Sequence, residues 1–106
     1  MQRILSYPEA IKEAIVQEMT QNPSVIVLGQ GVDDPKGILG TTKGLVDKFG
    51  SERVFDTPLA EDGMTGVAIG AALAGLRPIH VHIRMDFVLL AMNQLINMAA
   101  KMRYMF

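Results

Sequence analysis

Residues 55–79 read FDTPLAEDGMTGVAIGAALAGLRPI and predict a helix between two strands. From Glu61 onward the residues are almost all small or aliphatic, which favours a closely packed helix over residues 61–76. Two short strands flank this helix, RVFDTP (53–58) before it and IHVHI (79–83) after it. Arg77 and Pro78 form a turn that leads into the second strand. Two strands joined through a helix are typical of a parallel sheet with a right-handed crossover.

The sequence before this unit predicts a further helix, a strand and a short helix. Ser6 followed by Glu9 forms a capping-box pattern, and apolar residues then recur at helical spacing, so a helix is expected over about residues 7–21. The segment SVIVLG (24–29) is a β-branched apolar run, as in a strand buried on both faces. A loop rich in Gly, Asp and Pro separates it from a short helix expected at residues 43–49.

A last helix is expected from about Asp86, with one apolar face formed by Val88, Met92, Leu95, Ala99 and Met102. The whole pattern predicts an α/β fold in three layers, α/β/α, with about three parallel strands and four helices. It reads as one domain over residues 1–106. Three strands are few for such a sheet, and the final residues KMRYMF carry no helix-ending signal, so we expect a partial, truncated domain.

Composition argues against several classes of function. The 106 residues carry a net charge of −1, so no basic surface for nucleic acid is expected. There is no cysteine for a disulfide or a thiolate metal site, and the first residues lack the apolar core of a secretory signal. The longest apolar-leaning run, residues 87–100, is too short to span a membrane. We therefore expect a cytoplasmic protein that contacts neither membranes nor nucleic acid.

Glu61 opens a pattern that resembles a known cofactor motif. It is followed, after four residues, by Gly66 and Val67 and, after two more, by Gly70, Ala71 and Ala72. This spacing is similar to the pyrimidine-domain motif of thiamine-diphosphate enzymes. The blocks YPEAIKEAIVQEM, TKGLVDKFGSERVFDTPLAEDG, AIGAALAGLRPI and MDFVLLAMNQLINMAAKMRYM resemble the start of the β subunit of 2-oxo acid dehydrogenase E1 components, of the pyruvate, branched-chain and acetoin types. The resemblance covers nearly the whole chain.

The resemblance implies that four residues bind thiamine diphosphate. In the family, the glutamate at the position of Glu61 hydrogen-bonds N1′ of the aminopyrimidine and favours the imino tautomer, whose exocyclic nitrogen takes the C2 proton of the thiazolium. The resulting ylid attacks the 2-oxo acid. The aromatic at the position of Phe87 stacks on the aminopyrimidine, and Leu59 and Ala60 line the ring. Without the resemblance, Glu61 reads as an acid at the positive end of a helix and Phe87 as a core residue.

The sequence departs from the family at three positions. Gln30 and Val81 stand where the family has acids, and the acid at the position of Gln30 is associated with a proton network between active sites. Arg84 stands at an apolar position. Because a neutral amide cannot relay protons, these changes weaken the expectation of catalysis. In the family a different domain holds the diphosphate and magnesium, so we expect an E1 α-like partner and an isolated chain that is inactive.

Other interpretations stay open. The chain could be a non-catalytic interaction module that kept the fold, and we expect a homodimer because the stripe Gly66, Gly70 and Ala74 permits close helix contact. Nucleotide binding of the Rossmann type is disfavoured because GQGVDDPKG lacks the G-x-G-x-x-G pattern. His80 and His82 share one face of a strand, but no third ligand is positioned by the sequence, so no metal site is predicted. The residues do not specify which 2-oxo acid is used.

Overall fold

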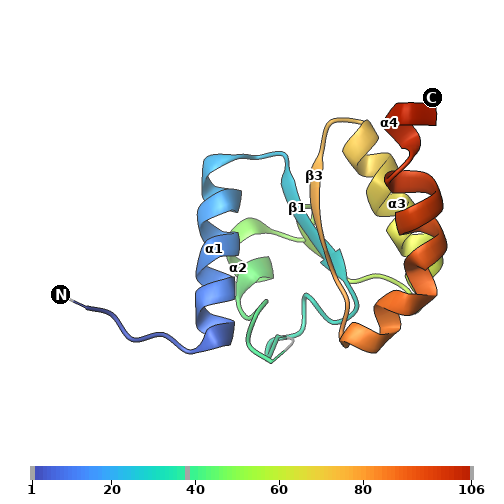
Figure 1. Ribbon diagram of the computed structural model, residues 1–106. Helices are drawn as coiled ribbons and strands as arrows, with labels where there is room; N and C mark the ends of the chain where they lie inside the picture. Colours follow the sequence, from blue (N-terminus) through green and yellow to red (C-terminus); the bar gives the residue numbers. More distant parts are fainter. Residues whose placement is uncertain (1, 38, 106) are drawn as a thin grey trace.

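The computed structural model describes residues 2–37 and 39–105, and it places a three-stranded parallel sheet between helices (Figure 1). The α-helices are α1 (Tyr7–Gln21), α2 (Leu45–Phe49), α3 (Glu61–Leu73) and α4 (Met102–Met105). The strands are β1 (Val25–Gly29), β2 (Val54–Phe55) and β3 (Arg77–Val81), and two other helical segments are η1 (Met85–Ala91) and η2 (Asn93–Ala99). The predicted α/β class with a small parallel sheet is confirmed.

Strand β1 is the centre of the sheet, because the strand order is β2-β1-β3. All five of its residues are buried, as expected for a continuous apolar run with layers on both sides. Val27 is aligned with Val54 of β2 and with Ile79 of β3. Both pairings are parallel, so the carboxyl ends of all three strands lie at one edge of the sheet.

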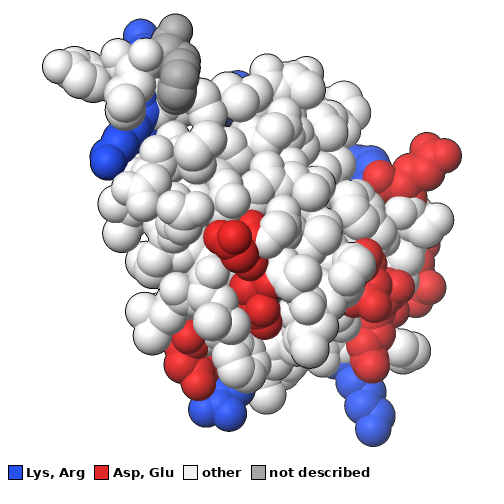
Figure 2. All heavy atoms as spheres, turned by 90° about the vertical axis from the view of Figure 1, so that its right-hand side faces the viewer, with Lys and Arg blue, Asp and Glu red and all other residues white. Residues whose placement is uncertain are grey.

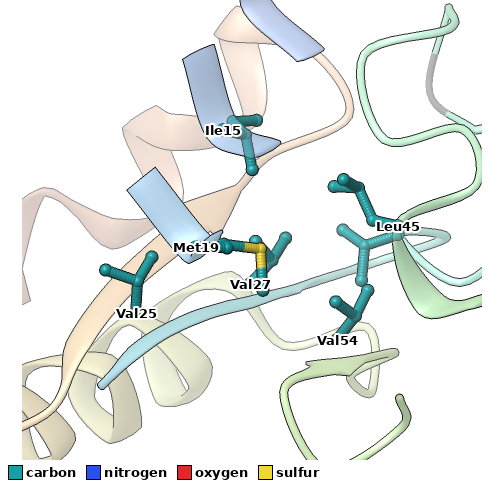
Figure 3. Packing of buried hydrophobic residues seen from close by; sticks show 7 residues of the cluster. Ile15, Met19, Val25, Val27, Leu45 and Val54 are labelled. Atoms are coloured by element: carbon teal, nitrogen blue, oxygen red, sulfur yellow. The ribbon is translucent and has the colours of Figure 1, made fainter. Parts of the chain in front are cut away.

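The side chains of β1 alternate between two cores. On one face, Val25 and Val27 pack with α1 and α2 in a cluster of Ile15, Met19, Val25, Val27, Val32, Leu45 and Val54 (Figure 3). On the other face, Ile26 and Leu28 pack with Ala68 of α3. Each fully buried Val, Leu or Ile side chain contributes about 1.5–3 kcal/mol. The two cores therefore hold one helical layer on each side of the sheet, as the three-layer prediction requires.

The first helix has the predicted bounds and the predicted cap. The backbone N–H of Ser6 donates to Oε2 of Glu9 at 2.8 Å, and the backbone N–H of Glu9 donates to Oγ of Ser6 at 3.4 Å. The carboxyl end of the helix is held by Arg53, whose guanidinium donates to the backbone carbonyls of Met19, Asn22 and Val25 at 2.8–3.2 Å. This role of Arg53 was not predicted from the sequence.

Several predicted boundaries differ from those observed. Helix α2 begins at Leu45 rather than residue 43, β2 spans Val54–Phe55 rather than residues 53–58, and β3 ends at Val81 rather than residue 83. Helix α3 ends at Leu73 rather than residue 76, because Gly75 adopts a φ of +105° that terminates helices readily. Strand β3 begins at Arg77, whose N–H donates to the carbonyl of Ser24 at 2.8 Å, although a turn was expected there. Pro78 is tolerated within the strand because β3 is an edge strand with one neighbour.

The last helical region is not one α-helix from about Asp86, as expected. It consists of the 3₁₀-helix η1, the π-helix η2 and the short α-helix α4. Because 3₁₀ and π turns hold different numbers of residues, the predicted apolar face does not form one buried stripe. Ala91 is the fully buried residue, whereas Ala99 is exposed. Across the described ranges, no helix is both long and apolar enough for a membrane crossing.

Candidate functional site

The four predicted site residues and Gln30, which was not predicted as a site residue, follow strands at the same edge of the sheet. Gln30 comes directly after β1, Leu59, Ala60 and Glu61 follow β2, and Phe87 follows β3. Because the strands are parallel, these three connections meet at the carboxyl edge, which is where open α/β sheets bind ligands. The topology therefore brings together residues that are far apart in the sequence.

Glu61 is the first residue of α3 and is half-buried. Its Oε1 accepts a hydrogen bond from Nε2 of Gln30 at 3.3 Å. Within the described residues, no group donates to its Oε2. Ala60 at the N-cap offers no side-chain acceptor, so the first N–H groups of α3 add positive partial charge beside the carboxylate. In Glu61, therefore, Oε1 is held by Gln30, whereas Oε2 is available to accept a hydrogen bond from a ligand.

A second contact ties the β1 and β2 connections together. The backbone N–H of Gly31 donates to Oδ1 of Asp56 at 2.7 Å. Two residues before Gly31, Gly29 has a φ of +150°, and a Cβ at this position would collide with the carbonyl of Val81 in β3. Sequence reasoning missed Asp56 and the contact of Gln30. The available signal was their position directly after strands of a parallel sheet.

Phe87 reaches this edge from the β3 side. It is half-buried in η1, which packs against α3, and the guanidinium carbon of Arg84 lies 5.6 Å from its ring centroid. Leu59 is 79% exposed and Ala60 is also exposed, so both present apolar surface beside Glu61. The structure joins Gln30 to Glu61 directly, whereas Phe87 contacts Arg84 instead.

A cavity of about 420 Å³ opens at the same edge. Gln30 lines it on the β1 side and Ile83 and Arg84 line it on the β3 side, while Lys36 contributes a second cation. Arg84 also forms an ion pair with Asp86 at 3.3 Å, and both side chains are mostly exposed. Gln30, which lines this cavity, also contacts Glu61.

His80 and His82 form a pair on the α3 face of the sheet, as their alternation predicted. Their ring centroids are 4.4 Å apart, and Nδ1 of His80 lies 3.4 Å from Oγ1 of Thr65. Burial lowers the pKa of His80, and the neighbouring His82 lowers that pKa further. Among residues 2–37 and 39–105, no group of three or more His, Cys, Asp or Glu side chains is arranged to hold a metal ion.

The helix α3 makes the predicted close approach at one glycine of its small-residue stripe. A Cβ on Gly66 would lie 3.3 Å from the side chain of Gln94 in η2, whereas a Cβ on Gly70 would meet open space. Gly66 therefore serves packing within the chain. Gly70 lies on the outer surface of α3, where no other part of the described chain packs against it.

Comparison with known proteins places this arrangement in a family. Residues 4–106 match the transketolase pyrimidine-binding domain. The chain is 50% identical to the acetoin:2,6-dichlorophenolindophenol oxidoreductase subunit beta of Cupriavidus necator, over all of this chain and 34% of that protein. It is 48% identical to the 2-oxoisovalerate dehydrogenase subunit beta of Bacillus subtilis, over 95% of this chain and 31% of that protein. It is 45% identical to the mitochondrial pyruvate dehydrogenase E1 component subunit beta of Chaetomium thermophilum, over 92% of this chain and 25% of that protein.

The chain thus spans between a quarter and about a third of the length of these relatives. The family match extends over nearly every residue and includes all the strands and helices described above. The chain belongs to the transketolase pyrimidine-binding domain family, and it is homologous to part of the E1 β subunits of 2-oxo acid dehydrogenases.

Proposed function

We propose that this chain is a partial domain that supplies the pyrimidine-binding side of a thiamine-diphosphate site in a 2-oxo acid dehydrogenase of the E1 type. The observation that carries the proposal is the placement of Glu61. Its carboxylate is half-buried at the carboxyl edge of the sheet, one oxygen is held by Gln30, and the other oxygen has no donor among the described residues. A buried ring nitrogen that must gain and lose a proton needs such a partner.

The residues at this edge fit an aminopyrimidine. Oε2 of Glu61 can share a proton with N1′, Leu59 and Ala60 offer apolar surface beside it, and Phe87 offers a ring face for an offset stack. When bound, thiamine diphosphate supplies the covalent chemistry that 2-oxo acid decarboxylation requires. In this proposal the chain holds the ring in place and presents Glu61 as the proton partner of N1′.

The proposed site is completed by another chain or domain. The relatives are named as beta subunits. The family resemblance implies that a different domain holds the diphosphate and magnesium. We therefore propose an E1 α-like partner that binds the diphosphate end of the cofactor. The identity of the 2-oxo acid is set by that complete assembly.

A chimera provides the test. Residues 4–106 replace the matching third of the Cupriavidus necator relative, and the chimera is produced together with the alpha subunit of that oxidoreductase. Exchange of the C2 proton of thiamine diphosphate for deuterium is then followed by NMR. The unchanged chimera should exchange this proton rapidly, whereas Glu61→Gln should slow the exchange by about 100-fold, because an amide cannot share a proton with N1′.

Asp62→Asn is the matched control, since it removes an exposed carboxylate from the neighbouring position of the same helix turn. It should leave the exchange rate close to that of the unchanged chimera. If Glu61→Gln assembles normally and exchanges the proton as fast as the control, Glu61 has no part in the mechanism and the proposal fails.

A further inference from the structure

We infer that Gln30 is a positioning residue for Glu61, which it holds through an amide hydrogen bond. This inference rests on the proposed function of Glu61. It concerns the residue at which the chain departs from its family, and it gives that residue a role in place of the missing acid. The observation behind it is the 3.3 Å contact between Nε2 of Gln30 and Oε1 of Glu61.

The chemistry of the two groups fixes the direction of this hydrogen bond. A carboxylate only accepts hydrogen bonds, so Gln30 must present its NH₂ group rather than its carbonyl oxygen. The contact occupies Oε1, whereas Oε2 accepts no hydrogen bond from the described residues and is available to a ligand. Both side chains are half-buried, which strengthens a hydrogen bond to a charged group relative to one in water.

A neutral amide and an acid affect Glu61 differently at this position. A second carboxylate would repel the charge of Glu61 or share a proton with it, and could pass that proton onward. The amide donates two N–H groups, carries no charge and exchanges no proton with its neighbour. Gln30 therefore keeps Glu61 in a fixed orientation and limits its proton transfer to the ligand side.

The backbone around Gln30 is held on both sides. Gly29 allows the end of β1 to approach the carbonyl of Val81, where any side chain would collide. Immediately after Gln30, the N–H of Gly31 is bonded to Asp56 at 2.7 Å. Asp56 directly follows β2 and Glu61 begins α3, so the dipeptide Gln30–Gly31 makes one contact at each end of the β2–α3 connection. Such anchoring is what a positioning role needs.

The first experiment tests the contact on the 106-residue chain without any cofactor. Side-chain amide signals of the glutamines are recorded by ¹H–¹⁵N NMR, with the Gln30 signal assigned by its loss in Gln30→Met. Glu61→Ala should move the Gln30 signal toward that of the exposed Gln2, while Asp62→Ala should move it much less. Backbone amide spectra check that each variant is folded.

A Gln30 signal that does not respond to Glu61→Ala in a folded chain overturns the inference, whatever the cofactor does. A response to Glu61→Ala that exceeds the response to Asp62→Ala supports the contact. An equal response to both substitutions also overturns the inference, because it shows a general charge effect and no specific hydrogen bond.

The second experiment asks whether the contact matters at the site. In the chimera described above, Gln30→Met should slow C2 proton exchange by about tenfold, the effect of losing one hydrogen bond to a charged group. Gln17→Met makes the same chemical change on the exposed face of α1 and should leave the rate unchanged. Equal rates in the two variants would overturn the positioning role.

The two proposals fail in different ways. If the amide signal reports the contact but Glu61→Gln leaves the exchange rate of the chimera unchanged, the proposed function fails while the hydrogen bond stands. If Glu61→Gln slows exchange and Gln30→Met does not, the proposed function stands and the positioning role fails.

Discussion

Nε2 of Gln30 lies 3.3 Å from Oε1 of Glu61, although 31 positions separate the two residues in the sequence. The contact joins the connection after the central strand β1 to the start of α3, which follows the neighbouring strand β2. The parallel pairing of β1 with β2 brings these two connections together. Gln30 is therefore in direct contact with the proposed catalytic glutamate.

Thiamine diphosphate with magnesium should bind the isolated chain very weakly. The aminopyrimidine gains a ring stack and one hydrogen bond to a charged group, together on the order of a few kcal/mol. Association costs at least about 4 kcal/mol in lost freedom, so a dissociation constant above about 1 mM is expected. Isothermal titration calorimetry measures this directly, and micromolar binding would show that the chain alone forms a complete site.

Arg53→Met should destabilise the fold by about 1–3 kcal/mol, because the carbonyls of Met19 and Asn22 at the end of α1, and that of Val25 in β1, lose this donor. Arg53→Lys keeps the charge but has no planar fork, and it should recover only part of this loss. The free energy of unfolding in urea measures both variants. Arg77→Met is the control because Arg77 is exposed. Equal stabilities of Arg53→Met and Arg77→Met would contradict the structural role of Arg53.

The sequence predicted elements whose ends are determined by adjacent residues. It did not predict features that depend on packing between segments far apart in the chain. The helix α1 was predicted with its observed bounds because its cap at Ser6 and its end at Asn22 lie in adjacent residues. The start of β3 was missed because only its edge position makes Pro78 acceptable in a strand. The final helical region was predicted as one helix because its changes of winding accompany packing against α3, where Gln94 meets Gly66.

In the candidate site, too, some residues were named from the sequence, whereas the contacts between neighbouring strands were not. Glu61, Phe87, Leu59 and Ala60 were named from a family resemblance, and their roles stay predictions. The contact of Gln30 with Glu61 could not be read from the sequence, because it depends on which strands are neighbours. The same holds for the bond between Gly31 and Asp56.

Stability should decrease as the pH falls below the ordinary pKa of histidine, because of His80. Burial and, to a smaller extent, His82 lower the pKa of His80 in the folded chain from its ordinary value of 6.5. The unfolded chain then binds the proton more readily. The contribution of His80 is therefore fully present above 6.5 and is lost as the pH falls toward the lowered folded value.

Urea unfolding at about pH 7.5 and about pH 5.5 measures this effect, since histidine changes charge in that interval. His80→Leu should reduce the loss of stability between these conditions. His82→Gln should reduce it less, because burial is the larger cause of the shift and stays in place. An unchanged pH dependence in His80→Leu would contradict the prediction.

The outer surface formed by α3 and the segments after β3 is strongly apolar. Val67 and Leu73 of α3 are 54% and 66% exposed, and Leu89, Leu90 and Ile96 are 67%, 61% and 55% exposed. Most atoms on this side of the molecule are uncharged (Figure 2). Gly70 adds no side chain between the exposed residues of α3, so another helix can approach its backbone closely. Contiguous apolar surface of this kind commonly marks an interface.

We predict that two copies of the chain associate through this surface about a twofold axis, which would bury it without any further protein. Light scattering over a concentration series should then give twice the 11.6 kDa mass of the chain. Val67→Glu and Leu90→Glu should each shift the protein toward the monomer, because a buried unpaired charge is costly.

Ile4→Glu is the matched control, since Ile4 is 96% exposed on the N-terminal segment before α1, at the opposite side of the molecule (Figure 1). A mass that stays at 11.6 kDa into the high micromolar range would exclude this self-association. Dissociation by Ile4→Glu instead would place the interface on the α1 side.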